Sequence, residues 1–337
     1  MRNSAPDDTF TALELNEKVS AVLYLSLLAE TFTVTGPIFV LVLLGLILKR
    51  LDFIDDQFVV VSSRLVFSLC LPVLLFTTIS DIDLASTLAL NLLSFSGFGA
   101  ALTFAISWLV AILLVQPRID RGVFVQASFR SNLGVVGLAL CANAYGTEGL
   151  VLASLLMAVM TIVYNILSVV VLSYYNAARA ISWRGVLFDI ATNPLIVAIL
   201  LALIVSGLRL PIPLVLERTG AYLGSLALPL ALLGTGASMN LRALRHSSSV
   251  TLLCILLKTL LLPLLITWLA WLLGYRDLTL GVLFLLFMSP TATASFIMVK
   301  SMGGNDALAA NLIMTTTLVS LVTGSLGLFL LRVLALA

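Results

Sequence analysis

A polar stretch inside an apolar segment offers the most direct chemistry in this 337-residue sequence. The stretch FRSNLGVVG, residues 129–137, contains Arg130, Ser131 and Asn132 in succession. Two glycines follow them, Gly134 and Gly137. Polar and charged side chains at bilayer depth are costly, and they commonly mark a substrate path. Glycines weaken a helix, so the backbone can break here and turn its amides toward a ligand. The stretch therefore predicts part of a binding site for a small organic anion.

A second helix break is predicted at SPTAT, residues 289–293. Pro290 has no backbone N–H to donate, and its ring disrupts the carbonyl contact four residues earlier. Ser289, Thr291 and Thr293 surround it with hydroxyl groups. A helix that restarts after a break presents unpaired amides and the positive end of its dipole, which favours an anion. Two such starts could together hold a carboxylate. The alternative is that Pro290 only kinks the helix and that the hydroxyls join helices.

Three further polar residues lie at mid-span in apolar segments. Tyr164 and Asn165 occur together in VYNILS, and Ser68 precedes Pro72 by about one turn. Each is a candidate substrate contact. A mid-span asparagine also commonly forms a hydrogen bond between helices, so both roles remain open for Asn165.

Cations, but no acids, lie deep in the apolar segments. These cations are Arg64, Arg130 and Lys258. They suit an anionic substrate, by attraction or by neutralising it during passage. The alternative is that each extends its charged end to the cytoplasmic surface. Because sodium and proton sites usually need an embedded carboxylate, the sequence favours uniport, or coupling through the substrate's own charge.

Composition identifies a polytopic all-α membrane protein. Hydrophobic residues make up 61% of the chain and charged residues only 10%, against about 25% charged in soluble proteins. Three cysteines lie in apolar runs as packing residues, and the single His246 cannot form a metal site alone. The sequence has no basic tract for nucleic acid and no catalytic constellation. We therefore expect no enzyme activity, no cofactor and no metal.

Ten segments are long and apolar enough to span a bilayer, which needs about 20 residues each. They cover approximately 33–49, 57–79, 89–115, 122–144, 148–174, 192–208, 213–238, 250–273, 278–300 and 306–333. Residues 1–32 form an N-terminal extension. Its apolar part, residues 19–29, is too short to span, and we expect part of the extension to be a helix on the membrane surface.

The two halves of the chain repeat each other. Pro37 matches Pro194 and Pro72 matches Pro229, with the same offset in each case (194 − 37 = 157 and 229 − 72 = 157). Five spans per repeat, over residues 33–175 and 192–337, predict that the second copy enters from the opposite membrane side. Inverted repeats of this kind belong to secondary transporters with a site near the midplane. Residues 176–191 are the predicted cytoplasmic linker.

Charge in the short loops predicts the orientation. With the N-terminus outside, nine lysines and arginines fall in cytoplasmic loops and three in external loops. We therefore expect both termini on the non-cytoplasmic side of a cell membrane, namely a bacterial inner membrane.

The motifs GPIFVLVLLGLILKR, FRSNLGVVGLAL, LALPLALLGTGASM and MSPTATASFIM resemble the auxin efflux carrier family in its compact prokaryotic form. The resemblance implies a ten-helix fold like that of bile-acid symporters and sodium/proton antiporters, in which discontinuous helices 4 and 9 cross. It implies a scaffold of helices 1, 2, 6 and 7 and a moving transport domain of helices 3–5 and 8–10. Asn132 matches the family's crossover asparagine, and Pro290 matches its crossover proline. Where plant members carry proline, this chain has Ser131, and it lacks their long cytoplasmic loop.

The resemblance also implies carboxylate substrates, namely auxin in plants and malonate or malate in some bacterial relatives. We expect a secondary transporter that exports a small mono- or dicarboxylate by alternating access with an elevator motion. One alternative is a sodium- or proton-coupled organic-anion symporter of the same fold. Another is a ligand-sensing membrane receptor, although the sequence shows no soluble output domain. The expected partners are the anion, the lipid bilayer and a second copy bound through the scaffold helices.

Overall fold

The computed structural model describes residues 8–81, 90–175, 183–239 and 248–337. Over these ranges the chain is all-α, and its extended pairing is a single isolated bridge between Ser131 and Thr291. His246 and residues 176–182 of the predicted linker lie outside the described ranges.

The first half of the described chain contains six α-helices and two π-helical turns. They are α1 (Asp8–Arg50), α2 (Asp56–Leu65), η1 (Val66–Cys70), α3 (Leu71–Ser80), α5 (Leu90–Leu114), α6 (Arg118–Phe129), η2 (Leu133–Gly137) and α7 (Leu138–Tyr175). The second half follows with α8 (Trp183–Ala191), α9 (Pro194–Gly207), α10 (Leu214–Ala237), α11 (Ser249–Leu256), η4 (Leu257–Leu261), α12 (Leu262–Leu272), α13 (Asp277–Met288), α14 (Ala294–Ser301) and α15 (Asp306–Val333).

The molecule is apolar outside and partly polar inside, as a membrane protein must be. Seven helices in the described ranges are long and apolar enough to cross a membrane. Their outer faces carry large apolar side chains such as Val60, Leu113 and Tyr222, whereas hydroxyl residues such as Ser107 and Thr316 are buried. Because lipid cannot satisfy polar groups, hydroxyls pack between helices and bond to backbone carbonyls.

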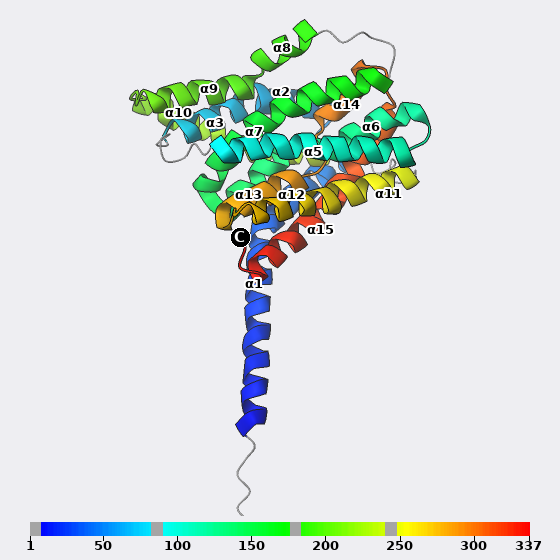
Figure 1. Cartoon of the computed structure of the whole chain (residues 1–337). Helices are drawn as coiled ribbons and strands as arrows, with labels where there is room; N and C mark the ends of the chain where they lie inside the picture. Colours follow the sequence, from blue (N-terminus) through cyan, green and yellow to red (C-terminus); the bar gives the residue numbers. More distant parts are fainter. Residues whose placement is uncertain (1–7, 82–89, 176–182, 240–247) are drawn as a thin grey trace, which may run out of the picture.

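Two features of the helices differ from the sequence prediction, and a third agrees with it. Helix α1 runs from Asp8 to Arg50 without a break, so residue 32 is not a helix boundary, and its first half extends beyond the helical body (Figure 1). The predicted linker contains a nine-residue helix, α8. The predicted boundary between the fourth and fifth spans agrees with the structure, because Gly146, with a φ of 59° and a ψ of −144°, kinks α7 between them. Glycine adopts this backbone conformation without steric cost.

Two prolines are accommodated by π-helical turns. Segment η1 ends just before Pro72 and η4 just before Pro263. A π-turn absorbs an extra residue in a helix, so it changes which side chains face inward. In η1, Phe67 points toward the interior and Ser68 is exposed, and in η4 Lys258 is buried.

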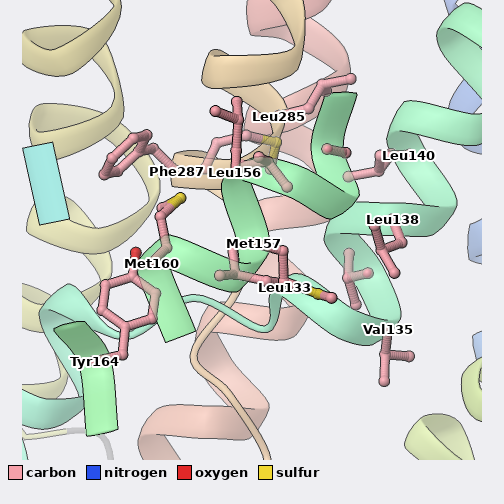
Figure 2. Packing of buried hydrophobic residues seen from close by; sticks show 14 of the residues in the cluster. Leu133, Val135, Leu138, Leu140, Leu156, Met157, Met160, Tyr164, Leu285 and Phe287 are labelled. Carbon is pink, nitrogen blue, oxygen red and sulfur yellow. The ribbon is translucent and has the colours of Figure 1, made fainter. Parts of the chain in front are cut away.

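The core lies around the two central breaks, between α7 and α13. Leu156, Met157 and Met160 of α7 pack near Leu133, Leu285 and Phe287 (Figure 2). Helices α1, α3, α9 and α10 pack mainly on one another, and α5, α6, α7, α12 and α13 pack together as a second group. The division into scaffold and transport domains, and a homodimer through the scaffold, stay predictions.

Candidate functional site

The two helix breaks lie against each other and are joined through their backbones. Helix α6 ends at Phe129 and helical structure resumes at Leu133, while α13 ends at Met288 and α14 begins at Ala294. The Asn132 amide donates to the Pro290 carbonyl at 2.7 Å, and the Ala292 amide donates to the Arg130 carbonyl at 3.1 Å. These two bonds fix the breaks in an antiparallel crossing.

Each break is followed by a helix start without a side-chain cap. Asn132 precedes η2 and Thr293 precedes α14, and neither side chain bonds to the amides of the helix that follows it. The first amides of a helix carry partial positive charge and need acceptors. Both starts can therefore present unpaired donors to an anion.

A cavity of about 170 Å³ opens beside the crossing. Its walls come from η1, both breaks, α7 and the start of α9, and its lining contains no Asp or Glu. The lining residues are Phe67, Arg130, Ser131, Asn132, Leu133, Gly134, Met157, Thr161, Tyr164, Asn165, Asn193, Leu195, Ala292, Thr293 and Ala294. A cavity of this size and polarity suits a small organic acid.

Arg130 supplies the cavity's positive charge. Its Nη2 donates to Asn165 Oδ1 at 2.9 Å, and its Nη1 lies 3.4 Å from Ser168 Oγ. These bonds to α7 hold the half-buried guanidinium beside the break instead of letting it extend to the surface. A planar guanidinium suits two-point recognition of a carboxylate.

Asn132 offers a donor that lacks a partner among the described residues. The residue is 5% exposed, and its Nδ2 has no hydrogen-bond acceptor there. A buried polar group without a partner costs free energy, so it is generally explained by strain, water or a ligand. A bound carboxylate would satisfy this amide.

Lys258 lies behind the crossing and is 2% exposed. Its Nζ donates to Ser131 Oγ at 2.5 Å and to the Phe287 carbonyl at 3.2 Å. The alternative that Lys258 extends to the membrane surface is therefore wrong. The reason is its environment, because η4 packs against α6, α13 and α15. Arg64, in contrast, is exposed on α2.

Seven of the predicted site residues line the cavity, and four do not. Those in the lining are Arg130, Ser131, Asn132, Gly134, Tyr164, Asn165 and Thr293. Ser289 Oγ instead donates to the Leu285 carbonyl at 2.7 Å, and Thr291 Oγ1 donates to the Ala127 carbonyl at 2.7 Å. Pro290 contributes its carbonyl to the crossing, and Ser68 is exposed because Phe67 takes the inward position in η1.

Several lining residues escaped the sequence analysis. Phe67, Met157 and Ala292 have no distinguishing chemistry within apolar segments. Thr161 lies one turn before Asn165 on α7, a spacing that could have identified it. Asn193 caps α9, its Oδ1 accepting from the Leu195 amide at 3.0 Å. The Asn-Pro pair at positions 193 and 194 is a helix-start signal that could have placed it.

Comparison with known proteins places the chain in a family. Residues 32–327 match the model of a family described as "Membrane transport protein". An "Uncharacterized transporter" of Methanothermobacter thermautotrophicus is 29% identical over 292 residues, which cover 85% of this chain and 93% of that protein. A "Putative malonate transporter" of Rhizobium meliloti is 25% identical over 311 residues, or 90% of this chain and 97% of that protein. The chain therefore belongs to the membrane transport protein family, which confirms its resemblance to the auxin efflux carriers.

Proposed function

We propose that this membrane transporter exports a small carboxylate, of the malonate or malate type, by alternating access. The observation that carries the proposal is the crossing of two helix breaks beside a cavity that holds Arg130 and Asn132 and no acid. The carboxylate would accept from the Asn132 amide, the guanidinium and the first amides after each break. The similarity to a "Putative malonate transporter" supports a dicarboxylate.

The fold we propose for the whole chain has ten spans in two inverted repeats. Beyond the seven long helices, three further spans come from the short helix α9, from α6 with the start of α7, and from α13 with α14 (7 + 3 = 10). The last two contain the breaks at corresponding places in the two halves. This arrangement supports the repeat that the proline offsets predict.

A second, nearly closed cavity supports alternating access. It has about 10 Å³, room for at most one water, and is lined by residues that include Thr35, Phe39, Met288 and Ser325. Met288 precedes the second break whereas Ala294 of the open cavity follows it, so the two cavities lie on opposite sides of the crossing. The repeat offset maps residues 35–39 onto 192–196, which include the open cavity's Asn193 and Leu195.

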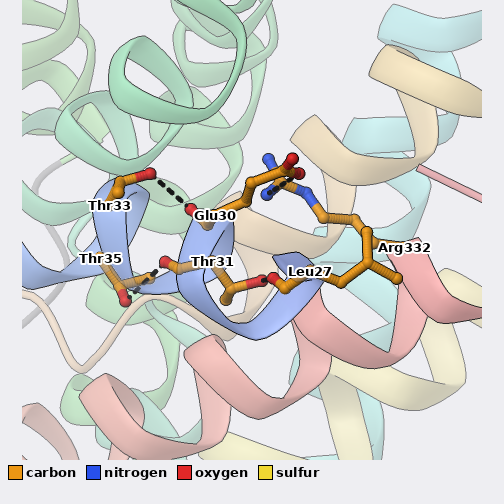
Figure 3. Close-up of polar contacts among 6 residues, drawn as sticks. All are labelled: Leu27, Glu30, Thr31, Thr33, Thr35 and Arg332. Carbon is orange, nitrogen blue, oxygen red and sulfur yellow. Dashed lines mark hydrogen bonds and ion pairs between the residues drawn. The ribbon is translucent and has the colours of Figure 1, made fainter. Parts of the chain in front are cut away.

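Contacts between α1 and α15 hold this second cavity shut. Ser325 Oγ donates to Thr35 Oγ1 at 2.9 Å. Figure 3 shows the second contact, in which Arg332 Nη1 lies 3.9 Å from Glu30 Oε2. In the proposed orientation, with both termini outside, these contacts form an external gate. The open cavity then faces the cytoplasm, where an exporter collects its substrate.

Counterflow of labelled malonate in vesicles containing the purified protein tests this function. Because Asn132→Ala removes a hydrogen bond to a charged ligand, we expect flux to fall by about tenfold or more. Asn91→Ala is the matched control, since Asn91 is an exposed asparagine on α5 outside the cavity. Wild-type flux in Asn132→Ala would exclude this site, and a receptor without transport would show no counterflow at all.

A further inference from the structure

A second basic side chain, Lys258, lies at the crossing in addition to Arg130, which lines the open cavity. Lys258 Nζ lies directly behind Ser131, whose side chain belongs both to the crossing and to the cavity lining. Ser131 Oγ also accepts from the Tyr164 hydroxyl at 3.4 Å, and Tyr164 lines the same cavity. One hydroxyl thus separates the amino group of Lys258 from the proposed position of the anion.

The described surroundings of Lys258 do not neutralise an ammonium. In the described ranges its amino group donates to a hydroxyl and to a carbonyl, and neither ion pair found there includes it. A buried charge is costly unless it is paired with an opposite charge. An empty site therefore disfavours the protonated amine, and an anion at the crossing favours it.

The titratable groups around the crossing, besides Lys258 itself, are one further cation and two neutral groups. Arg130 and Tyr164 lie across the crossing. The thiol of Cys254 lies one helical turn before Lys258 and accepts a hydrogen bond from Ser128 Oγ. The charged residues on the helices packed against η4 lie at the helix ends: Arg118, Asp120 and Arg121 on α6, Asp277 on α13, and Asp306 and Arg332 on α15.

We propose that Lys258 is the counter-charge of the bound anion and that it takes up a proton as the anion binds. This coupling rests on the proposed function and adds a proton to it. The amine gains one proton from water in the open cavity, and no bond to the substrate forms. Lys258 acts through Ser131 and is a positioning residue, not a direct ligand.

Linkage fixes the sign of the pH dependence. If the anion favours protonation of Lys258, protonation strengthens anion binding by the same factor. Anion affinity is then highest where the amine is protonated, and it falls as pH rises through the titration of Lys258. A carrier of this kind moves the anion together with the proton on Lys258, which compensates part of the anion's charge and takes the place of a coupled sodium ion.

Calorimetry of malonate binding to the purified full-length protein tests the coupling. Titrations between about pH 7.5 and about pH 9.5 keep the malonate carboxyls ionised, and buffers of different ionisation enthalpy report the protons taken up. For the wild type we expect net proton uptake and an affinity loss on the order of tenfold across this range. Lys258→Met should lose the uptake and bind about tenfold more weakly at the lower pH.

Two further variants make the result decisive. Lys300→Met removes the same charge from an exposed position on α14 and should behave like the wild type. Lys258→Arg keeps its charge at every pH tested, so it should retain affinity but lose both proton uptake and pH dependence. If Lys258→Met does not fold, the Lys258→Arg variant alone tests whether Lys258 takes up the proton.

The proposal is overturned by malonate binding without proton uptake, or by uptake that persists in Lys258→Met or Lys258→Arg. Absence of malonate and malate binding to the wild type is a different failure. It would overturn the proposed carboxylate site itself, and the coupling with it.

Discussion

At the scale of single residues, the site combines cations with neutral donors and holds no acid in its lining. Arg130 and Lys258 approach the same break from opposite sides, one beside the cavity and the other behind Ser131. In the proposed cycle an entering anion meets the charge of Arg130 and the positive helix starts, and Lys258 becomes charged as the anion binds. The residue types at the break thus support the proposed selectivity for anions.

Arg130 is expected to contribute binding energy directly. Arg130→Ala removes the guanidinium and leaves Asn165 without its donor at 2.9 Å, so malonate affinity should fall by about tenfold or more. Arg64→Ala is the matched control, because Arg64 lies exposed on α2. Equal malonate dissociation constants for the two variants, measured by calorimetry, would contradict a role for Arg130 in binding.

Residue chemistry explains which site residues the sequence could identify. Arg130, Asn132 and Thr293 were recognisable because polar groups at bilayer depth require a reason. Phe67 and Met157 were not, because an apolar wall facing a cavity has the same composition as one facing lipid. Ser68 was misplaced because a π-turn changes the inward face of a helix, and hydrophobic periodicity does not reveal such a turn.

At the scale of helices, α1 and α10 make the closest backbone approach within the group formed by α1, α3, α9 and α10. A Cβ on Gly45 would overlap the Leu233 carbonyl, and one on Gly236 would overlap the Val42 carbonyl. Small residues let membrane helices approach this closely, which increases their van der Waals contact. The α1–α10 pair is therefore closely packed, as the predicted scaffold requires.

Gly45→Ala should separate these two helices. Because backbone must shift to admit the methyl group, we expect a loss of about 1–3 kcal/mol in stability, seen as a melting temperature lower by several degrees. Gly207→Ala is the control, since nothing lies within 4 Å of a Cβ at that position. An unchanged melting temperature for Gly45→Ala in detergent would show that α1 and α10 are not held by this contact.

Helix positions were more predictable than helix ends. Apolar length located the long spans, and proline and glycine located the breaks, because both residues disturb helical hydrogen bonding or backbone preference. The continuous α1 and the added α8 were missed, since polar residues in a flanking segment do not themselves end a helix. Such boundaries depend on tertiary packing that the sequence does not display.

At the scale of the whole molecule, the two cavities differ in size on the two sides of one crossing. One has about 170 Å³ and the other about 10 Å³. A carrier that alternates must exchange these sizes, and α1 and α15 must then separate at Thr35 and Ser325. The structure thus represents one of the two states that the proposed cycle needs.

Locking α1 to α15 should stop transport without blocking the open cavity. The Thr35 and Ser325 side-chain oxygens lie 2.9 Å apart, so a Thr35→Cys/Ser325→Cys variant places two thiols close enough for a disulfide. After oxidation we expect malonate counterflow to be lost while malonate binding persists, and a reducing agent should restore counterflow. The native Cys70, Cys141 and Cys254 are buried, so oxidised single variants serve as controls. Full counterflow in a demonstrably cross-linked protein would show that α1 and α15 need not part, which would leave the alternating-access mechanism without its external gate.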